Sequence, residues 1–229
     1  MFWFNKRIHA DYDGFIDCHS HILPGVDDGV KTMKDSLAIL ERYAQMGIRE
    51  VVFTPHVMED VPNTPEDLRK RFAAFCEEYK GPVKLHLAAE YMMDHHFEEQ
   101  IEKGDLLTHG DGKHILVETS YFNPPANMDY ILFQLQSLGL VPILAHPERY
   151  MYMKKEQYGE IKDRGIQLQM NLGSLCGMYG SHVRERAEFL MNEGLYDMAG
   201  SDIHRPKMIE GYLAVQLKKV WALPMPEHL

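Results

Sequence analysis

Two histidines with one residue between them, His19 and His21, begin a series of potential metal ligands in this chain of 229 residues. Alternate residues of an extended strand point to the same side, so both imidazoles can reach one ion. Neutral imidazole binds zinc, manganese or iron, and carboxylates bind the same ions. The later members of the series are His56, Glu90, Glu118, His146, Asp202 and His204. These residue types predict a site that holds several divalent cations.

The set is a stronger signal than any of its members. A single histidine at a strand end is more often structural or exposed than a ligand. Ligand-type residues that recur in phase with successive strand ends are harder to explain by scatter over a surface. Burying Glu90 and Glu118 without a partner would also cost on the order of several kcal/mol each, unless a cation compensates them.

The remaining histidines lack this placement. We expect His86 to be a hydrogen-bonded core residue, and His114 begins a strand at the end of the fold remote from the site. Six others are expected to be exposed or helical: His9, His95, His96, His109, His182 and His228.

Two arginines, Arg149 and Arg205, each lie within three residues of a proposed ligand. A guanidinium group binds phosphate oxygens through two parallel hydrogen bonds, so this placement favours an anionic substrate. The alternative for either arginine is a salt bridge that holds its loop to a neighbouring carboxylate.

Other polar residues accompany the ligands. Of Asp27 and Asp28, one is expected to point inward, where it would bind an ion or protonate a leaving group; the alternative is a turn that caps the next helix. Asn171 ends a strand and is expected to hydrogen-bond to a ligand.

The elements that must position these residues alternate between short apolar runs and longer segments of helical period. This alternation is typical of a parallel sheet with crossover helices, and in an α/β barrel the C-terminal ends of the strands converge on one face. Thr32 and Gly47 are expected to bound a helix whose apolar face carries Met33, Leu37, Leu40 and Ala44, and Thr64-Pro65 to open the next. The seven expected strands are 15–19, 50–54, 84–90, 114–118, 141–146, 166–171 and 196–201.

Composition narrows the class of protein. A formal net charge of −10 argues against nucleic acid as a partner. Three scattered cysteines favour a reducing compartment, with the cytoplasm as the expected location, and no segment is long and apolar enough to insert into a membrane. Without repeats or linkers, residues 15–229 are expected to form one domain after a short extension, 1–14.

Taken together, these motifs resemble the PHP family, named for polymerase and histidinol phosphatase. The resemblance is strongest to the bacterial manganese-dependent protein-tyrosine phosphatases of capsule and exopolysaccharide systems. It covers most of the chain and rests on DCHSHILPGVDDG, TPH, AAE, VETS, AHPERY and GSDIH.

The resemblance implies a distorted (β/α)7 TIM-like barrel and up to three ions, most readily Mn²⁺, with iron or zinc as alternatives. One ion would be held by His19, His21, Glu90 and Asp202. Glu90 would bridge to a second ion completed by Glu118 and His146. A third would use His56 and His204, and Asp28 would complete it or supply a proton. Arg149 and Arg205 would bind the phosphate.

The implied reaction is hydrolysis of phosphotyrosine, on a protein such as a bacterial tyrosine kinase tail, by metal-activated water. A cysteine nucleophile with an arginine six residues later is excluded, because Pro24, Pro82 and His182 stand at those positions. Two alternatives stay open: a small-molecule phosphatase, such as one acting on histidinol phosphate, and a non-catalytic regulatory protein that retains the metal cluster. The oligomeric state is not predicted.

Overall fold

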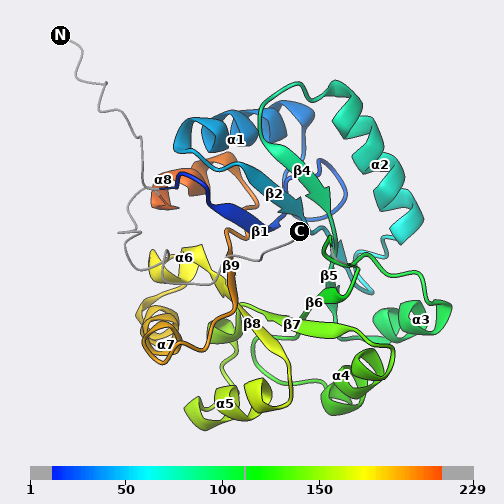
Figure 1. Cartoon of the computed structure of the whole chain (residues 1–229), viewed down its shortest axis with the longest axis vertical. Helices are drawn as coiled ribbons and strands as arrows, with labels where there is room; N and C mark the ends of the chain where they lie inside the picture. Colours follow the sequence, from blue (N-terminus) through cyan, green and yellow to red (C-terminus); the bar gives the residue numbers. More distant parts are fainter. Residues whose placement is uncertain (1–11, 111, 213–229) are drawn as a thin grey trace.

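The computed structural model describes residues 12–110 and 112–212, which form an α/β fold. Every pairing between the strands of this part of the chain is parallel. The helices form an outer ring around the curled strands (Figure 1). The strands are β1 (Ile16–Ser20), β2 (Glu50–Phe53), β3 (His56–Val57), β4 (Lys84–Leu87), β5 (Glu90–Met92), β6 (His114–Glu118), β7 (Val141–Ala145), β8 (Gln167–Asn171) and β9 (Met198–Gly200).

The strands pair as two sheets, in the orders β1-β2-β4 and β3-β5-β6-β7-β8-β9. The expected strand 84–90 is divided, because β4 pairs with β2 whereas β5 pairs with β3. The neighbouring chain is interrupted at the same level, between β2 and β3, by Pro55. Pro55 has no N–H to donate, but its carbonyl accepts from the Glu90 N–H at 3.1 Å. The parallel α/β arrangement is therefore confirmed, with shorter strands than the sequence indicated.

The first and last described strands also meet. The N–H of His21 donates to the carbonyl of Ile203 at 3.0 Å, and the N–H of Asp202 donates to the carbonyl of His19 at 2.8 Å. A parallel bridge joins Ser20 and Ile203. The segments after β1 and β9 consequently lie side by side.

Helix boundaries follow local capping. Thr32 Oγ1 accepts from the Asp35 N–H at 3.2 Å, and Gly47 ends the helix with φ 90°. The predicted apolar face of this helix was wrong at Leu37, whose side chain is 37% exposed. The buried face is formed by Ser36, Ile39, Leu40, Tyr43 and Met46. The main helices are α1 (Met33–Met46), α2 (Pro65–Glu78), α3 (His95–Lys103), α4 (Met128–Ser137), α5 (Lys155–Asp163), α6 (Leu172–Leu175), α7 (Ser181–Asn192) and α8 (Ile209–Tyr212).

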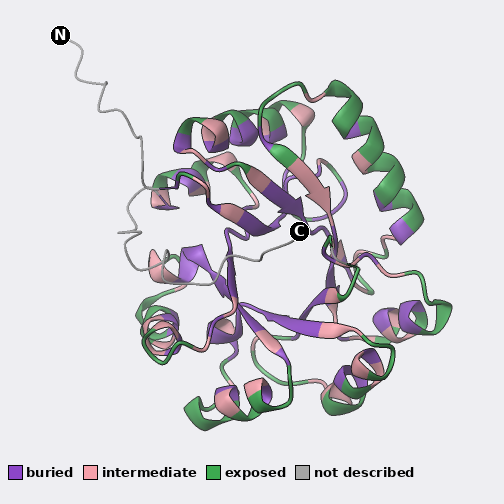
Figure 2. Ribbon diagram, in the orientation of Figure 1, coloured by how far each residue is buried: buried purple, intermediate pink, exposed green. Residues whose placement is uncertain are grey.

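Two apolar clusters hold this scaffold together. The larger packs helices against the sheets, and its buried strands contrast with the exposed outer surfaces of the helices (Figure 2). The smaller brings together Cys18, Leu116, Ile143, Ala145 and Met198 from four different strands. Burial of these side chains provides most of the driving force that sets the strand ends in place. Among the described residues, no helix has the length and apolarity needed to cross a membrane.

The expectation for His109 was wrong. This side chain is only 3% exposed, and its Nε2 lies 3.1 Å from the carbonyl oxygen of Cys18. His86 does form a hydrogen bond, to Glu50 at 2.7 Å, but its side chain is partly exposed rather than in the core. His95, His96 and His182 lie on helices, whereas His9 and His228 are outside the described residues.

Candidate metal centre

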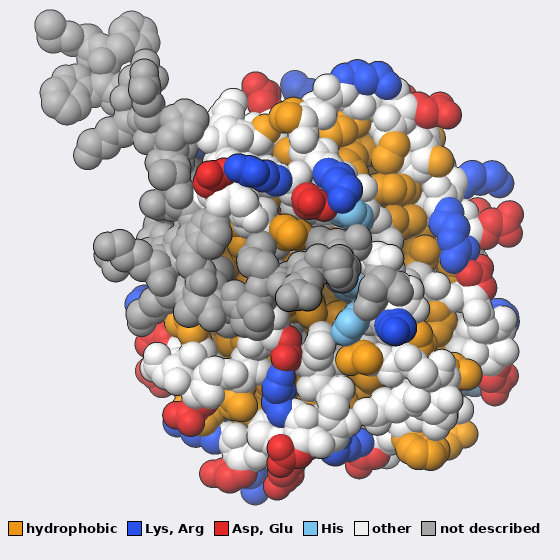
Figure 3. Space-filling model, viewed as in Figure 1, with side chains coloured by type: hydrophobic (Ala, Val, Ile, Leu, Met, Phe, Trp, Pro, Cys, Tyr) orange, Lys and Arg blue, Asp and Glu red, His pale blue; other side chains and the backbone are white. Residues whose placement is uncertain are grey.

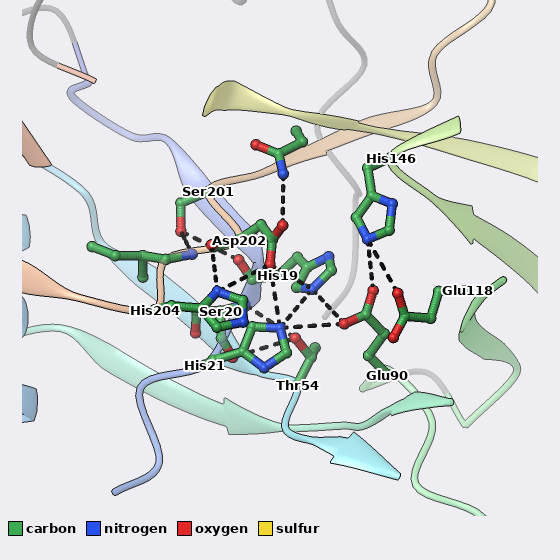
Figure 4. A network of polar contacts seen from close by, with 12 residues as sticks. His19, Ser20, His21, Thr54, Glu90, Glu118, His146, Ser201, Asp202 and His204 are labelled. Carbon is green, nitrogen blue, oxygen red and sulfur yellow. Dashed lines mark hydrogen bonds and ion pairs between the residues drawn. The ribbon is translucent and has the colours of Figure 1, made fainter. Parts of the chain in front are cut away.

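The predicted ligands converge where β1, β6, β7 and β9 end and where the short strands β3 and β5 begin. His19 lies on β1, Glu90 begins β5 and Glu118 ends β6, whereas His146 and Asp202 follow β7 and β9. Their side chains point toward one another in Figure 4. Three groups of residues could each hold an ion, because the ligand atoms within each group all lie within 4.8 Å of one another. The groups are His19, His21, Glu90 and Asp202; His56, Glu90 and Glu118; and His21, Asp28, His56 and His204.

The first group is wholly buried and tightly packed. The Nε2 atoms of His19 and His21 are 3.0 Å apart. Glu90 Oε2 lies 3.1 Å from the first nitrogen and 3.2 Å from the second. Asp202 Oδ1 is 3.5 Å and 3.3 Å from the same two atoms.

The partners of the other ring nitrogens fix the tautomers of this pair. His19 Nδ1 donates to Gln169 Oε1 at 2.7 Å, and His21 Nδ1 donates to Asp27 Oδ2 at 2.9 Å. Both Nε2 lone pairs then face the same point, where they repel unless a cation or a shared proton lies between them. This arrangement fits a bound divalent ion.

The second group contains buried polar atoms without a hydrogen bond. His56 Nδ1, Glu90 Oε2 and Glu118 Oε1 all belong to this class. His56 Nδ1 lies 3.1 Å from each carboxylate oxygen. His146 falls outside the 4.8 Å group, but its Nε2 is 3.0 Å from Glu90 Oε1 and 3.7 Å from Glu118 Oε2. A cation would satisfy these buried atoms, and their N and O donors suit manganese, iron or zinc.

The third group is more open to solvent. Asp28 Oδ1 lies 3.5 Å from His56 Nε2 and 3.4 Å from His204 Nε2, although its side chain is 72% exposed. His204 stacks on His21 with ring centroids 4.0 Å apart. The buried member of the aspartate pair is Asp27, which orients His21 and accepts from the Gly29 N–H at 2.9 Å.

Backbone strain is concentrated at this site. Of the described residues other than glycine, only His146 and Asp202 have positive φ, at 36° and 52°. Such conformations cost on the order of 1–3 kcal/mol and cluster at functional sites. Close packing adds a constraint at Gly200, where a Cβ would lie 2.3 Å from the Cβ of His19.

The electrostatics favour ionised carboxylates. Burial alone would raise the pKa of Glu90, but the neighbouring His19 and His56 outweigh it and lower the pKa well below its usual range. The pKa of Asp202 is lowered in the same way, against its burial, chiefly by His19. Burial lowers the pKa of His19, but Glu90 and Asp202 dominate and raise it to about 9. Histidines held by carboxylates in this way exchange protons for a cation.

A pocket of about 380 Å³ opens beside the ligands. Histidine side chains are visible near the middle of this face in Figure 3. Arg149 and Arg205 both line the pocket. Arg149 also donates to Asp202 Oδ2 at 3.0 Å, so it forms the salt bridge considered as an alternative while it faces the pocket. No ion pair of Arg205 is seen among the described residues.

The sequence did not identify three residues of this region. Gln169 could have been found, because it stands two positions before Asn171 on β8 and therefore on the same side of the strand. Tyr121 and Tyr179 line the pocket from loops and belong to no recognisable motif. Asn171 donates to Asp202 Oδ2 at 2.6 Å, which places it beside a predicted ligand.

A buried cluster of imidazoles and carboxylates beside an arginine-lined pocket is the arrangement of a metal-dependent enzyme that handles anions. The family model described as capsular polysaccharide synthesis, CpsB/CapC, matches residues 15–220, and the chain belongs to this family. The match confirms the resemblance that the motifs indicated.

Individual relatives agree with this family membership. The tyrosine-protein phosphatase YwqE of Bacillus subtilis strain 168 is 29% identical over 198 residues, which cover 84% of this chain and 78% of YwqE. The tyrosine-protein phosphatase CpsB of Streptococcus pneumoniae is 28% identical over 222 residues, which cover 90% of this chain and 91% of CpsB.

Solved structures show the same relationship. One from the work on YwqE of B. subtilis and CpsB of S. pneumoniae, called unique metal-dependent tyrosine phosphatases, superposes with a TM-score of 0.79 at 26% identity. The match covers 90% of this chain and 84% of that one. The lactonase Lmo2620 of Listeria monocytogenes, with a TM-score of 0.53 and 13% identity, shares the fold alone.

Proposed function

We propose that this chain is a metal-dependent protein-tyrosine phosphatase of capsule or exopolysaccharide synthesis. The observation that carries the proposal is the convergence of buried imidazole and carboxylate atoms that lack hydrogen bonds beside an arginine-lined pocket. The family membership and the relatives named tyrosine-protein phosphatase support the substrate class.

The proposed ligands are His19, His21, His56, Glu90, Glu118, His146, Asp202 and His204, with two or three ions. When bound, the ions would supply Lewis acidity and an activated water. Manganese is the proposed metal on the resemblance to the manganese-dependent phosphatases alone, because nitrogen and oxygen donors without thiolate also accept iron or zinc. We further propose that the two sheets act as one distorted seven-stranded barrel, and that residues 15–229 form a single domain.

The residues of the chain itself bind and orient the phosphate. Arg149 is held at the pocket wall by Asp202, and Arg205, which lines the same pocket, contributes a second guanidinium. These cations would stabilise charge that develops on the phosphate oxygens. The pKa of Asp28 is lowered, first by its hydrogen bond with His204, so its carboxyl is ionised at neutral pH. An ionised carboxylate favours the role of ligand over that of proton donor.

The proposed substrate is phosphotyrosine on a protein, most specifically the tail of a bacterial tyrosine kinase. A cytoplasmic location is part of the same proposal, and all three cysteines are free. Histidinol phosphate is the competing substrate, since an alkyl phosphate would use the same ligands with a different pocket rim.

Metal-stripped protein refilled separately with manganese, iron or zinc tests the proposal. We expect hydrolysis of a phosphotyrosine peptide, with a much lower kcat/KM on histidinol phosphate. The reverse preference would establish the small-molecule phosphatase. Lack of turnover on either substrate with every metal would instead favour the non-catalytic metal-binding protein.

A further inference from the structure

Two tyrosine rings lie against the guanidinium of Arg149. Tyr121 follows β6 and Tyr179 precedes α7, and each ring centroid is 4.2 Å from the guanidinium carbon. Both side chains line the same pocket as Arg149. We call Tyr121 and Tyr179 the tyrosine pair.

Each ring is itself held in place by neighbours. The Tyr179 hydroxyl accepts from Asn171 Nδ2 at 3.3 Å. The Tyr121 ring packs edge-on against His146, with centroids 5.8 Å apart, and stacks with Tyr150 at 6.3 Å. The tyrosine pair thus connects Arg149 to the proposed ligand His146 and to Asn171, which donates to the proposed ligand Asp202.

Arginine is a long side chain that loses rotamer freedom when it is fixed. An aromatic face attracts the cation but accepts no in-plane hydrogen bond from it. One N–H of Arg149 is taken by Asp202 at 3.0 Å, and the side chain is 16% exposed. The remaining N–H groups are therefore available to an anion in the pocket.

We propose that the tyrosine pair positions Arg149, so that the guanidinium is oriented for phosphate before substrate binds. This inference rests on the proposed phosphatase function. The rival explanation is direct stacking of the rings on the phenyl group of phosphotyrosine. Inorganic phosphate separates the two explanations, because it has a phosphate but no ring.

The experiment compares Tyr121→Leu and Tyr179→Leu with Tyr121→Phe, which keeps the ring, in manganese-loaded protein. We expect each leucine variant to weaken competitive inhibition by inorganic phosphate about tenfold, the order of one partly desolvated cation–π contact. The kcat/KM on a phosphotyrosine peptide should fall by the same factor. Tyr121→Phe should stay within about twofold of wild type.

Tyr130→Leu is the matched control, because this tyrosine is 56% exposed on α4 and does not line the pocket. Circular dichroism melting identifies a leucine variant that fails to fold, and the other leucine variant then carries the same expectation. Combining Tyr121→Leu with Arg149→Ala should give little further loss, since the ring acts through the arginine.

Two results would overturn the inference. One is an unchanged inhibition constant for phosphate together with a reduced kcat/KM on the peptide, which would establish direct stacking. The other is a double variant whose losses multiply. If the wild type hydrolyses no phosphate ester, the proposed function fails, and calorimetric binding of inorganic phosphate to the same variants still decides whether the tyrosine pair positions Arg149.

Discussion

Two regions along the strands carry similar residue types in different arrangements. We call the region where β2 and β4 begin the N-terminal end, and the candidate metal centre, where β5 begins and β1, β6, β7 and β9 end, the C-terminal end. At the N-terminal end, Glu50 Oε2 accepts from His86 at 2.7 Å and Lys84 at 3.0 Å; Lys84 is exposed, and the other two side chains are partly exposed. At the C-terminal end, Glu90 is buried among histidines with an oxygen that has no hydrogen bond. Histidine and glutamate close together therefore do not define a site. Buried donor atoms in excess of their partners distinguish the candidate metal centre.

The largest expected effect comes from exchanging one glutamate at each end. Glu90→Gln removes a carboxylate shared by two ligand groups, and kcat/KM on a phosphotyrosine peptide should fall at least roughly a thousandfold, with loss of bound metal. Glu50→Gln should leave kcat/KM within about twofold. Steady-state kinetics with metal analysis measures both. A Glu90→Gln enzyme with most of its activity would remove the distinction between the two ends.

The second prediction compares the two arginines of the C-terminal end, Arg149 and Arg205. Arg149→Lys keeps the charge but loses the planar fork, so kcat/KM should fall roughly a hundredfold. Arg205→Lys should cost about tenfold, because this exposed side chain is more fully solvated. Steady-state kinetics of the two variants measures both losses of kcat/KM. A larger loss for Arg205→Lys would mean that Arg205, not Arg149, is the main phosphate-binding arginine.

A third test concerns the residue behind His19. Gln169→Leu removes the acceptor of the Nδ1 proton, so metal affinity should fall by about 10–100-fold. Titration with a competing chelator measures the change. His86→Gln serves as the control, because it alters a histidine at the other end. Equal affinities for wild type and Gln169→Leu would show that this hydrogen bond does not orient the ligand.

Metal removal should make stability depend on pH. The pKa of His19 in the metal-free protein is raised to about 9, above its unfolded value near 6.5. The stabilisation from this proton is complete below pH 6.5 and is lost as pH rises through about 9. Urea midpoints of metal-free protein should therefore decrease between pH 6.5 and 9.5, whereas metal-loaded protein should vary less. A rising midpoint would contradict this sign.

The smallest effect is expected at the N-terminal end itself. His86→Gln weakens a partly exposed pair, so the free energy of unfolding should change by less than about 1 kcal/mol. Denaturant unfolding of His86→Gln measures this free energy, and Glu90→Gln is unfolded in the same way for comparison. A change of several kcal/mol would mean that this end is as dependent on its ion pairs as the metal centre.

Much of this arrangement could be predicted because strand periodicity and ligand types reinforce each other. The pair His19 and His21 share a strand face, and the caps at Thr32 and Gly47 depend on neighbouring residues only. Features set by tertiary packing could not be predicted. The division between β4 and β5 depends on which strand each half pairs with, and burial of His109 depends on its contact with the distant Cys18 carbonyl. Tyr121 and Tyr179 lie in loops, where no periodicity applies.

The junction between β1 and β9 has a consequence for biosynthesis. Ser201 N–H donates to Asp17 Oδ1 across 184 positions of the chain, and Asp202 faces His19 in the same place. A nascent polypeptide cannot complete the first group of candidate ligands until the last members of that group have left the ribosome. Contacts so distant in sequence also slow folding. Metal acquisition should consequently be a late event in maturation, and polypeptides that end before residue 202 should lack a complete first group.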